Sequence, residues 1–153
     1  MTTVRESFVL AMVDRLEGIS VSAGYNNDIP GGVLRTEQEP QGVIDVPVIT
    51  VWEEERRQRS ESVGWTITLT IDVTFWAQQA PDDPVATHVY LDSLREDALR
   101  AIGDSITIND HLFMIEDMDE QTFPILDGNP EIGFTLSPSF TYRLDPKDPT
   151  LLR

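Results

Sequence analysis

Residues 65–76 alternate strictly between two kinds of side chain, and this pattern constrains the fold more than any other feature of the sequence. One set is apolar: Trp65, Ile67, Leu69, Ile71, Val73 and Phe75. The positions between them carry threonine or Asp72, and Trp76 closes the segment. Because successive side chains of a strand point to opposite faces, we expect a long β-strand with one face in a core and a threonine-rich face outside it. A slip of one residue would expose the apolar set, so the pattern also fixes the register.

Two segments with helical spacing flank this strand. The first follows Thr3 and Glu6, which fit a capping box, and its apolar residues recur until Gly18. The second is expected to begin at Asp82-Asp83-Pro84, which supplies an N-cap and a first-turn proline, and to end at Gly103. We therefore expect two main helices that pack on one face of a sheet.

Shorter apolar segments complete the pattern. Before the long strand they are residues 19–25, 33–34 and 46–52, and after the second helix they are residues 106–108, 112–115, 123–126 and 132–144. We expect an α+β fold with a mixed, mainly antiparallel β-sheet and two main helices packed on it, in the order α-β-β-β-α-β-β-β. Residues 1–144 are expected to form a single domain, and residues 145–153 a C-terminal tail that is a candidate inter-subunit arm.

The chain is strongly acidic, with 11 Lys and Arg against 27 Asp and Glu and a net charge of −16. Such a surface repels phosphate backbones, so ordinary nucleic-acid binding is not expected, although nucleic acid would pass it without sticking. Self-repulsion of an acidic soluble protein is the simpler explanation of the charge alone. The absence of cysteine excludes disulfides, thiolate metal sites and cysteine nucleophiles. No run approaches the roughly 18 apolar residues of a membrane span, so we expect synthesis in a cytosol and no membrane partner.

No set of residues has the spacing of a catalytic or metal site. His88 and His111 each lack a second histidine at ligand spacing. Residues 116–120 contain four carboxylates, but they lack the glycine and terminal glutamate of a calcium loop, and a solvated acidic turn is the simpler interpretation. If the protein were an enzyme, the least poor candidates would be Glu116, Asp117, Asp119 and His111. We expect no catalytic residue, no cofactor and no metal.

The best functional candidate is the charged block between the strands that end at Trp52 and begin at Trp65. Three acids precede three arginines within this block, and it is too polar for a core, so it predicts a projecting β-hairpin with a charged tip. Acids followed by arginines can pair with a rotated copy of the same segment. The alternative is a solvated tip whose charges pair loosely. The candidate inter-subunit interface consists of Trp52, Glu53, Glu54, Glu55, Arg56, Arg57 and Arg59.

The order of these elements resembles the tail terminator family of long-tailed bacteriophages, whose members are also described as minor tail or tail completion proteins. The match covers most of the chain: Val13-Asp14-Arg15-Leu16 in the first helix, Val33-Leu34-Arg35, residues 46–52 before the charged hairpin, residues 65–76, residues 92–99 in the second helix, and Phe140-Thr141-Tyr142-Arg143. The acidic second half and residues 145–153 are not part of this match.

The resemblance implies a hexameric ring at the head-proximal end of the tail tube, which stops tube polymerisation and provides the surface for head attachment. The implied partners are further copies of the chain, the tail tube protein and neck or head-completion proteins, with DNA passing through the lumen without specific binding. The implied location is the tail or neck of the virion, after assembly in the host cytoplasm. Arg56, Arg57 and Arg59 are the residues expected to offset repulsion between acidic subunits.

Three other functions are compatible with the residues. A neck or head-completion connector, one layer nearer the capsid, would have the same general features. An acidic module that mimics DNA for a host protein would explain the excess of acid after residue 62. An enzyme is the third alternative.

Overall fold

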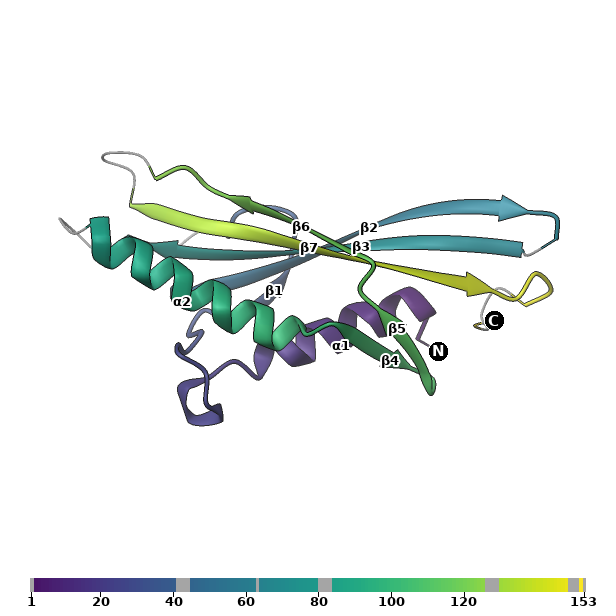
Figure 1. Ribbon diagram of the computed structural model, residues 1–153, viewed down its shortest axis with the longest axis horizontal. Coiled ribbons are helices and arrows are strands. Elements are labelled where there is room, and N and C mark those ends of the chain that lie inside the picture. The colour runs from purple at the N-terminus through teal and green to yellow at the C-terminus, as the bar shows by residue number, and fades with distance from the viewer. Residues whose placement is uncertain are drawn as a thin grey trace.

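The computed structural model describes residues 2–40, 45–62, 64–79, 84–125, 130–148 and 152. Its main element is a five-stranded sheet in the order β1-β2-β3-β7-β6 (Figure 1). The strands are β1 (Val33–Arg35), β2 (Val48–Ser60), β3 (Gly64–Gln78), β6 (Asp117–Thr122) and β7 (Glu131–Leu144). β1 pairs with β2 in parallel, and every other pair in this sheet is antiparallel. The predicted α+β class, with a mixed and mainly antiparallel sheet, is confirmed.

One face of the sheet is covered by α1 (Val4–Glu17), α2 (Pro84–Ile102) and a small hairpin of β4 (Ser105–Ile108) and β5 (His111–Met114) (Figure 1). The apolar set of β3 lies in this core, together with Phe8 and Met12 of α1, Leu94 of α2 and Ile106 of β4. The face of the sheet that packs on the helices is called the core face below. The opposite face, which carries the threonine side chains of β3, is called the open face. Neither described helix is both long and apolar enough to span a membrane.

Both helices end where the sequence indicates. Thr3 Oγ1 accepts a hydrogen bond from Glu6 N at 3.1 Å, and α1 ends at Gly18. α2 ends before Gly103, whose φ of 68° is favourable for glycine. The predicted start of this helix at Asp82 and Asp83 lies outside the described residues.

The strand expected at residues 19–25 is wrong. Val21–Ala23 form a short 3-10 helix instead. Ser20 Oγ accepts a hydrogen bond from Ala23 N at 3.2 Å, and this side-chain cap turns the chain. Gly24 then ends the turn in the left-handed region at a φ of 92°. The result is a loop that connects α1 to β1.

The predicted β-hairpin is present, but the charged block forms one of its strands, so the predicted position of the block at the hairpin tip is wrong. β2 continues through the block and pairs with β3 without interruption, from Val48 opposite Trp76 to Ser60 opposite Gly64. The turn lies beyond it, at Glu61 and Ser62. The long alternation of β3 provides a pairing edge for every residue of the block, and the acids that fall on the core face find arginine partners there.

The strands after α2 differ in two respects from the expected set. Asn109 and Asp110 form the predicted hairpin turn, with positive φ values of 50° and 65°. The acidic segment interpreted as a solvated turn is instead the edge strand β6, paired with β7. Of the strand expected at residues 123–126, the described residues 123–125 are not strand. In the tail, Leu152 forms an isolated bridge with Leu144.

Candidate functional site

Rows of hydroxyl side chains run along the open face on the neighbouring strands β3 and β7. Thr70 and Ser139 form a hydrogen bond between their hydroxyls at 3.0 Å, and Thr74 and Thr135 form another at 2.9 Å. Between these pairs, Ser137 Oγ donates to Asp72 Oδ1 at 2.7 Å. These groups satisfy one another across the strands, so the open face is polar without depending on any further partner.

The chain reaches over one end of the open face. Residues 36–37 and the strand residues Thr50, Trp52, Asp72 and Gln121 line a cavity of about 250 Å³. Trp52, a member of the candidate interface, is 38% exposed at this cavity. Trp76 does not share its exposure, because its Nε1 donates to Thr50 Oγ1 at 2.9 Å and its ring packs on Phe123. Of the two tryptophans near this cavity, Trp52 is therefore the one whose side chain is available to a partner.

The charged block divides between the two faces of the sheet. Glu53, Glu55, Arg57 and Arg59 lie opposite the apolar residues of β3, on the core face. Glu54 and Arg56 lie opposite Thr70 and Thr68, on the open face. This split follows from the period of two in a strand. The two halves of the candidate interface therefore have different surroundings.

The acids on the core face pair within the chain. The side chain of Glu53 is 7% exposed, and its Oε1 lies 3.3 Å from Arg5 Nη2 and 2.9 Å from Arg35 Nη2. Glu55, at 9% exposed, pairs with Arg57 and lies 3.7 Å from Arg5 Nη1. These ion pairs connect the first turn of α1 to β1 and β2. Glu53, Glu55 and Arg57 therefore act inside the subunit, contrary to the simple expectation that they all face a neighbour.

These ion pairs also change the titration of nearby groups. The hydrogen bond that Arg35 donates to Glu6, together with the charge of Glu53, raises the pKa of Arg35 above its ordinary value. Burial, with a further contribution from the negative charge of Glu55, raises the pKa of Tyr142 to about 12. Tyr142 and Glu55 line a groove of about 310 Å³ between the start of α1 and the sheet. The charged side chains in this groove are already paired, so it offers no free charge to a ligand.

The remaining charges of the block point outward. Glu54 and Arg56 are exposed, and neither has an ion-pair partner among the described residues. The guanidinium of Arg59 lies over the ring of Trp65 at 5.8 Å. Trp52, Glu54, Arg56 and Arg59 are thus the members of the candidate interface that the structure leaves available to a partner.

The residues considered for catalysis are not brought together. His111 is exposed at the hairpin turn, with its Nδ1 2.8 Å from Asn109 O. Glu116 accepts a hydrogen bond from Thr141 Oγ1 at 2.7 Å, and Asp117 caps its own strand through Met118 N. In the part of the chain that the structure describes, no group of three or more His, Asp or Glu side chains is placed to hold a metal ion.

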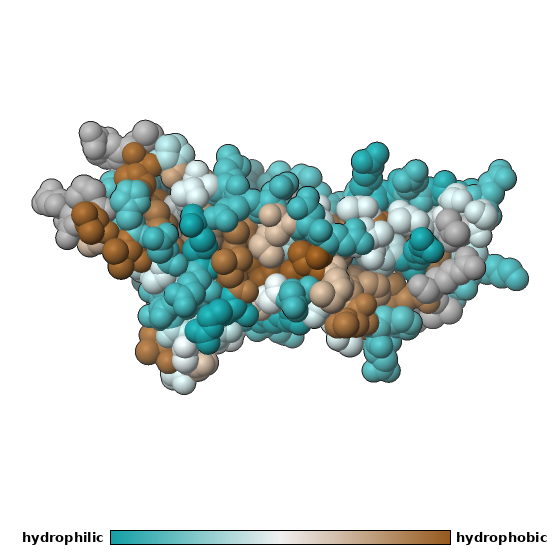
Figure 2. Space-filling model, in the orientation of Figure 1, coloured by the Kyte–Doolittle hydropathy of each residue, from teal (hydrophilic) through white to brown (hydrophobic). Residues whose placement is uncertain are grey.

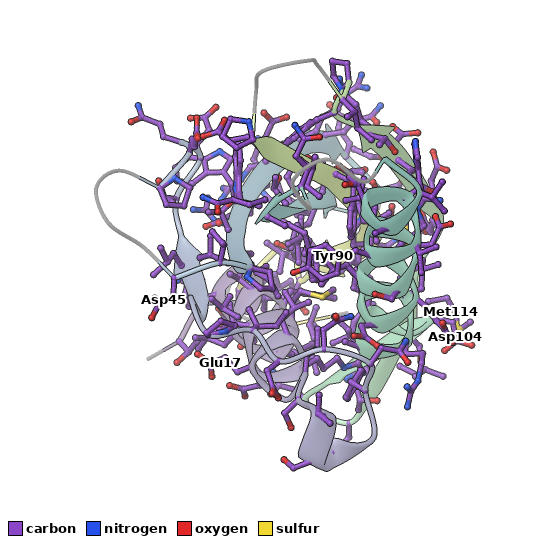
Figure 3. All side chains as sticks on the ribbon, turned by 90° about the vertical axis from the view of Figure 1, so that its left-hand side faces the viewer. Glu17, Asp45, Tyr90, Asp104 and Met114 are labelled. Atoms are coloured by element: carbon purple, nitrogen blue, oxygen red, sulfur yellow. The ribbon has the colours of Figure 1, made fainter. Side chains whose placement is uncertain are left out.

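The helical side of the molecule has a mixed surface. Apolar side chains are separated by hydrophilic ones, and they gather near the start of α2 and beside the β4–β5 hairpin (Figure 2). Val85 and Val89 of α2, and Leu112 and Met114 of β5, are exposed. Met114 points away from the body, whereas Tyr90 points from α2 toward the interior (Figure 3). Burial raises the pKa of Tyr90.

The candidate surface therefore consists of the open face and the outer side of β2. No known protein family matches this chain, and no curated protein is similar to it. The charged block was visible in the sequence, but its continuation as a strand was missed. The signal that could have found it is the length of the alternating segment after the turn, because residues 64–71 are long enough to pair with every residue from 53 to 60.

Proposed function

We propose that the chain is a structural subunit of a homo-oligomeric ring that caps the head-proximal end of a phage tail tube and joins it to the head. The observation that carries this proposal is a sheet of long strands that is packed by helices on one face and is polar and open on the other. Repeated around an axis, such a sheet supplies a smooth inner wall, and its helices form the outer layer.

The chemistry of the open face suits a wall that DNA passes. Retention of DNA requires Lys or Arg contacts that release counterions from its phosphates. Among the described residues of the paired strands, the register places Arg56 and Arg143 on the open face. Glu54, Asp72 and Asp119 lie on the same face, so acids outnumber bases there. The hydroxyls on this face are hydrogen-bonded to one another and carry no charge. We therefore expect this face not to retain DNA.

The overall charge of −16 requires a compensating attraction between copies. Arg56 and Arg59 are available for this attraction because neither has an ion-pair partner among the described residues. Arg57, in contrast, pairs with Glu55 inside the subunit. The ring is therefore expected to assemble through the β2 side of the subunit.

Mass measurement and imaging test the proposal. The purified chain is measured by sedimentation over a wide range of concentration and is then added to the tail tube protein of its own virus. The expected results are a single closed oligomer, visible as a ring, and tubes that stop growing once a ring sits on one end. A chain that stays monomeric at every concentration and leaves tube growth unchanged would contradict the proposal.

Position in the particle separates the proposed function from its nearest alternative. A tagged copy is expected at the end of the tube. A tag found only against the capsid would favour a neck or head-completion connector. Capture of a host DNA-binding protein, reversed by duplex DNA, would favour the acidic DNA mimic.

A further inference from the structure

The outer edge of β2 has no neighbouring strand over most of its length. β1 pairs only with residues 49–51 of β2. From Trp52 to the end of the strand, β2 is paired with β3 on one side, and the described residues place no strand on the other. The far ends of β2 and β3 extend well beyond β1 in Figure 1. An unpaired edge presents backbone N–H and C=O groups, which are available to another strand.

The opposite edge of the sheet is also unpaired among the described residues. It is formed by β6, which pairs with β7 on its inner side. β6 carries Asp117 and Asp119 on the open face, and both side chains are exposed. The two edges therefore differ in charge: the β2 edge carries arginines as well as acids, whereas every charged residue of β6 is an acid.

We propose that residues 53–58 of β2 pair antiparallel with β6 of a second copy of this chain, so that the sheet continues from one subunit to the next. This inference rests on the proposed ring and names the two surfaces that form its contact. The contact joins two different edges, and such head-to-tail contacts close into rings when the rotation between copies permits.

The direction of the strands agrees with such a ring. Within one subunit, β3, β7 and β6 each reverse the direction of the previous strand, so β6 runs antiparallel to β2. Rotation about an axis that lies roughly along the strands leaves their directions unchanged. A neighbouring β6 therefore meets β2 in the antiparallel sense, which is the more stable form of pairing.

The charges select one register. Arg56 and Asp119 both lie on the open face, and neither has an ion-pair partner among the described residues. If they face each other, Glu54 lies beside Gln121 on the same face. Glu55 then faces Glu120, but each of these acids already has an arginine partner within its own subunit.

The same register has a geometry that permits closure. Inside one subunit, Asp119 is level with Trp52, through Ser137 and Asp72. In the proposed contact it is level with Arg56, so each subunit is displaced by four residues along the strands. A displacement of four residues along the strands, combined with a width of four strands per subunit, corresponds to a strand tilt of about 35°. This tilt is within the range of closed barrels. The displacement also keeps the neighbouring β6 clear of β1.

Cysteine pairs test the contact directly because the chain contains no cysteine of its own. Glu54→Cys and Gln121→Cys in one chain are cross-strand neighbours in the proposed register, and both native side chains are exposed. Mild oxidation should give a ladder of covalent oligomers up to the closed ring on a denaturing gel. Glu54→Cys alone can link two chains at most. Glu54→Cys with Asp117→Cys is the matched control, because these positions are out of register and should not link.

A charge exchange gives an independent readout. Arg56→Glu alone and Asp119→Arg alone should each weaken association by about fivefold per contact, and the two changes in one chain should restore it. Far-ultraviolet circular dichroism checks that each variant is folded.

The outcomes separate this inference from the proposed function. If the wild-type chain forms a ring but the cysteine-pair variant gives no ladder, the edge contact is overturned and the ring remains. The same holds if the charge-exchanged variant does not regain association. Links formed by Glu54→Cys alone would show that β2 meets β2, and would also overturn it. A wild-type chain that never assembles would overturn both.

Discussion

Arg35 Nη2 lies 2.9 Å from Glu53 Oε1, and this contact joins β1 to β2 on the core face. Glu53 also accepts from Arg5 in the first turn of α1, at 3.3 Å. A segment that is charged along its whole length is thus held in a strand by carboxylates that are paired and nearly buried. The outer charges, which have no such role, are left for contacts with other molecules.

Replacement of Glu53 should therefore destabilise the subunit, whereas replacement of its neighbour should not. Glu53→Gln leaves Arg5 and Arg35 without their shared carboxylate, and because both arginines are partly exposed we expect a loss of about 1–2 kcal/mol in the free energy of unfolding. Glu54→Gln, on the open face, should change it by less than about 0.5 kcal/mol. Urea denaturation of both variants checks this, and equal effects would contradict the division between the two faces.

Asp97 holds the loop after the 3-10 helix against α2. It is fully buried and accepts hydrogen bonds from Asn26 N and Asn27 N, each at 2.9 Å, and from Asn27 Nδ2. Asp97→Ala leaves these donors unpaired and should cost about 2–4 kcal/mol in the free energy of unfolding. Asp92→Ala, an exposed position on the same helix, is the control and should cost less than about 0.5 kcal/mol. Thermal unfolding that gives the same midpoint for both variants would refute this role.

Phe8 fixes α1 on the sheet. Its ring is fully buried and lies 5.0 Å from the ring of Phe113 and 5.2 Å from those of Phe140 and Tyr142. Phe8→Ala should lower the free energy of unfolding by about 3–5 kcal/mol, through lost burial and a cavity. Leu10→Ala, on the exposed side of the same helix, should have a much smaller effect. Denaturant titration distinguishes the two, and a small effect at Phe8 would show that α1 packs differently.

Tyr142 should be the last tyrosine to ionise. Its pKa is raised to about 12 chiefly by burial, which disfavours the phenolate. In the unfolded chain a tyrosine has a pKa of about 10, so the folded state holds this proton more tightly. The resulting stability is fully present below about pH 10 and is lost as the pH rises toward about 12.

The ultraviolet absorbance of phenolate measures this titration. Tyr142→Phe should remove the component with the highest pKa and leave the others unchanged. A Tyr142 component with a pKa of about 10 would mean that the hydroxyl is open to water.

Sequence patterns specified the parts of the fold that depend on local physics. The alternation of residues 65–76 corresponds to β3, and Thr3 and Gly18 correspond to the ends of α1, because a strand period and a helix cap are both readable within a few residues. Local patterns of this kind did not predict that the charged block is part of a β-strand. The block pairs with β3 along its whole length, and Glu53 on its core face pairs with Arg5 and Arg35, which are remote in sequence.

The candidate surface was predicted in part for the same reason. The block around Arg56 was identified from its charges, but sequence does not show which side of a strand is unpaired. β6 was missed because its acids suggest a solvated turn, and only pairing with β7 makes it an edge strand. Composition thus located the charges, and tertiary pairing decides which of them face outward.

The most direct test of the proposed function is imaging of tail tubes assembled with and without the chain. Tubes are formed from the tail tube protein of the same virus, and the chain is added during growth. We expect a ring of the chain on one end of each tube and an arrest of further growth. Tubes that keep growing with no ring at either end, at concentrations of the chain well above that of tube ends, would contradict the proposal.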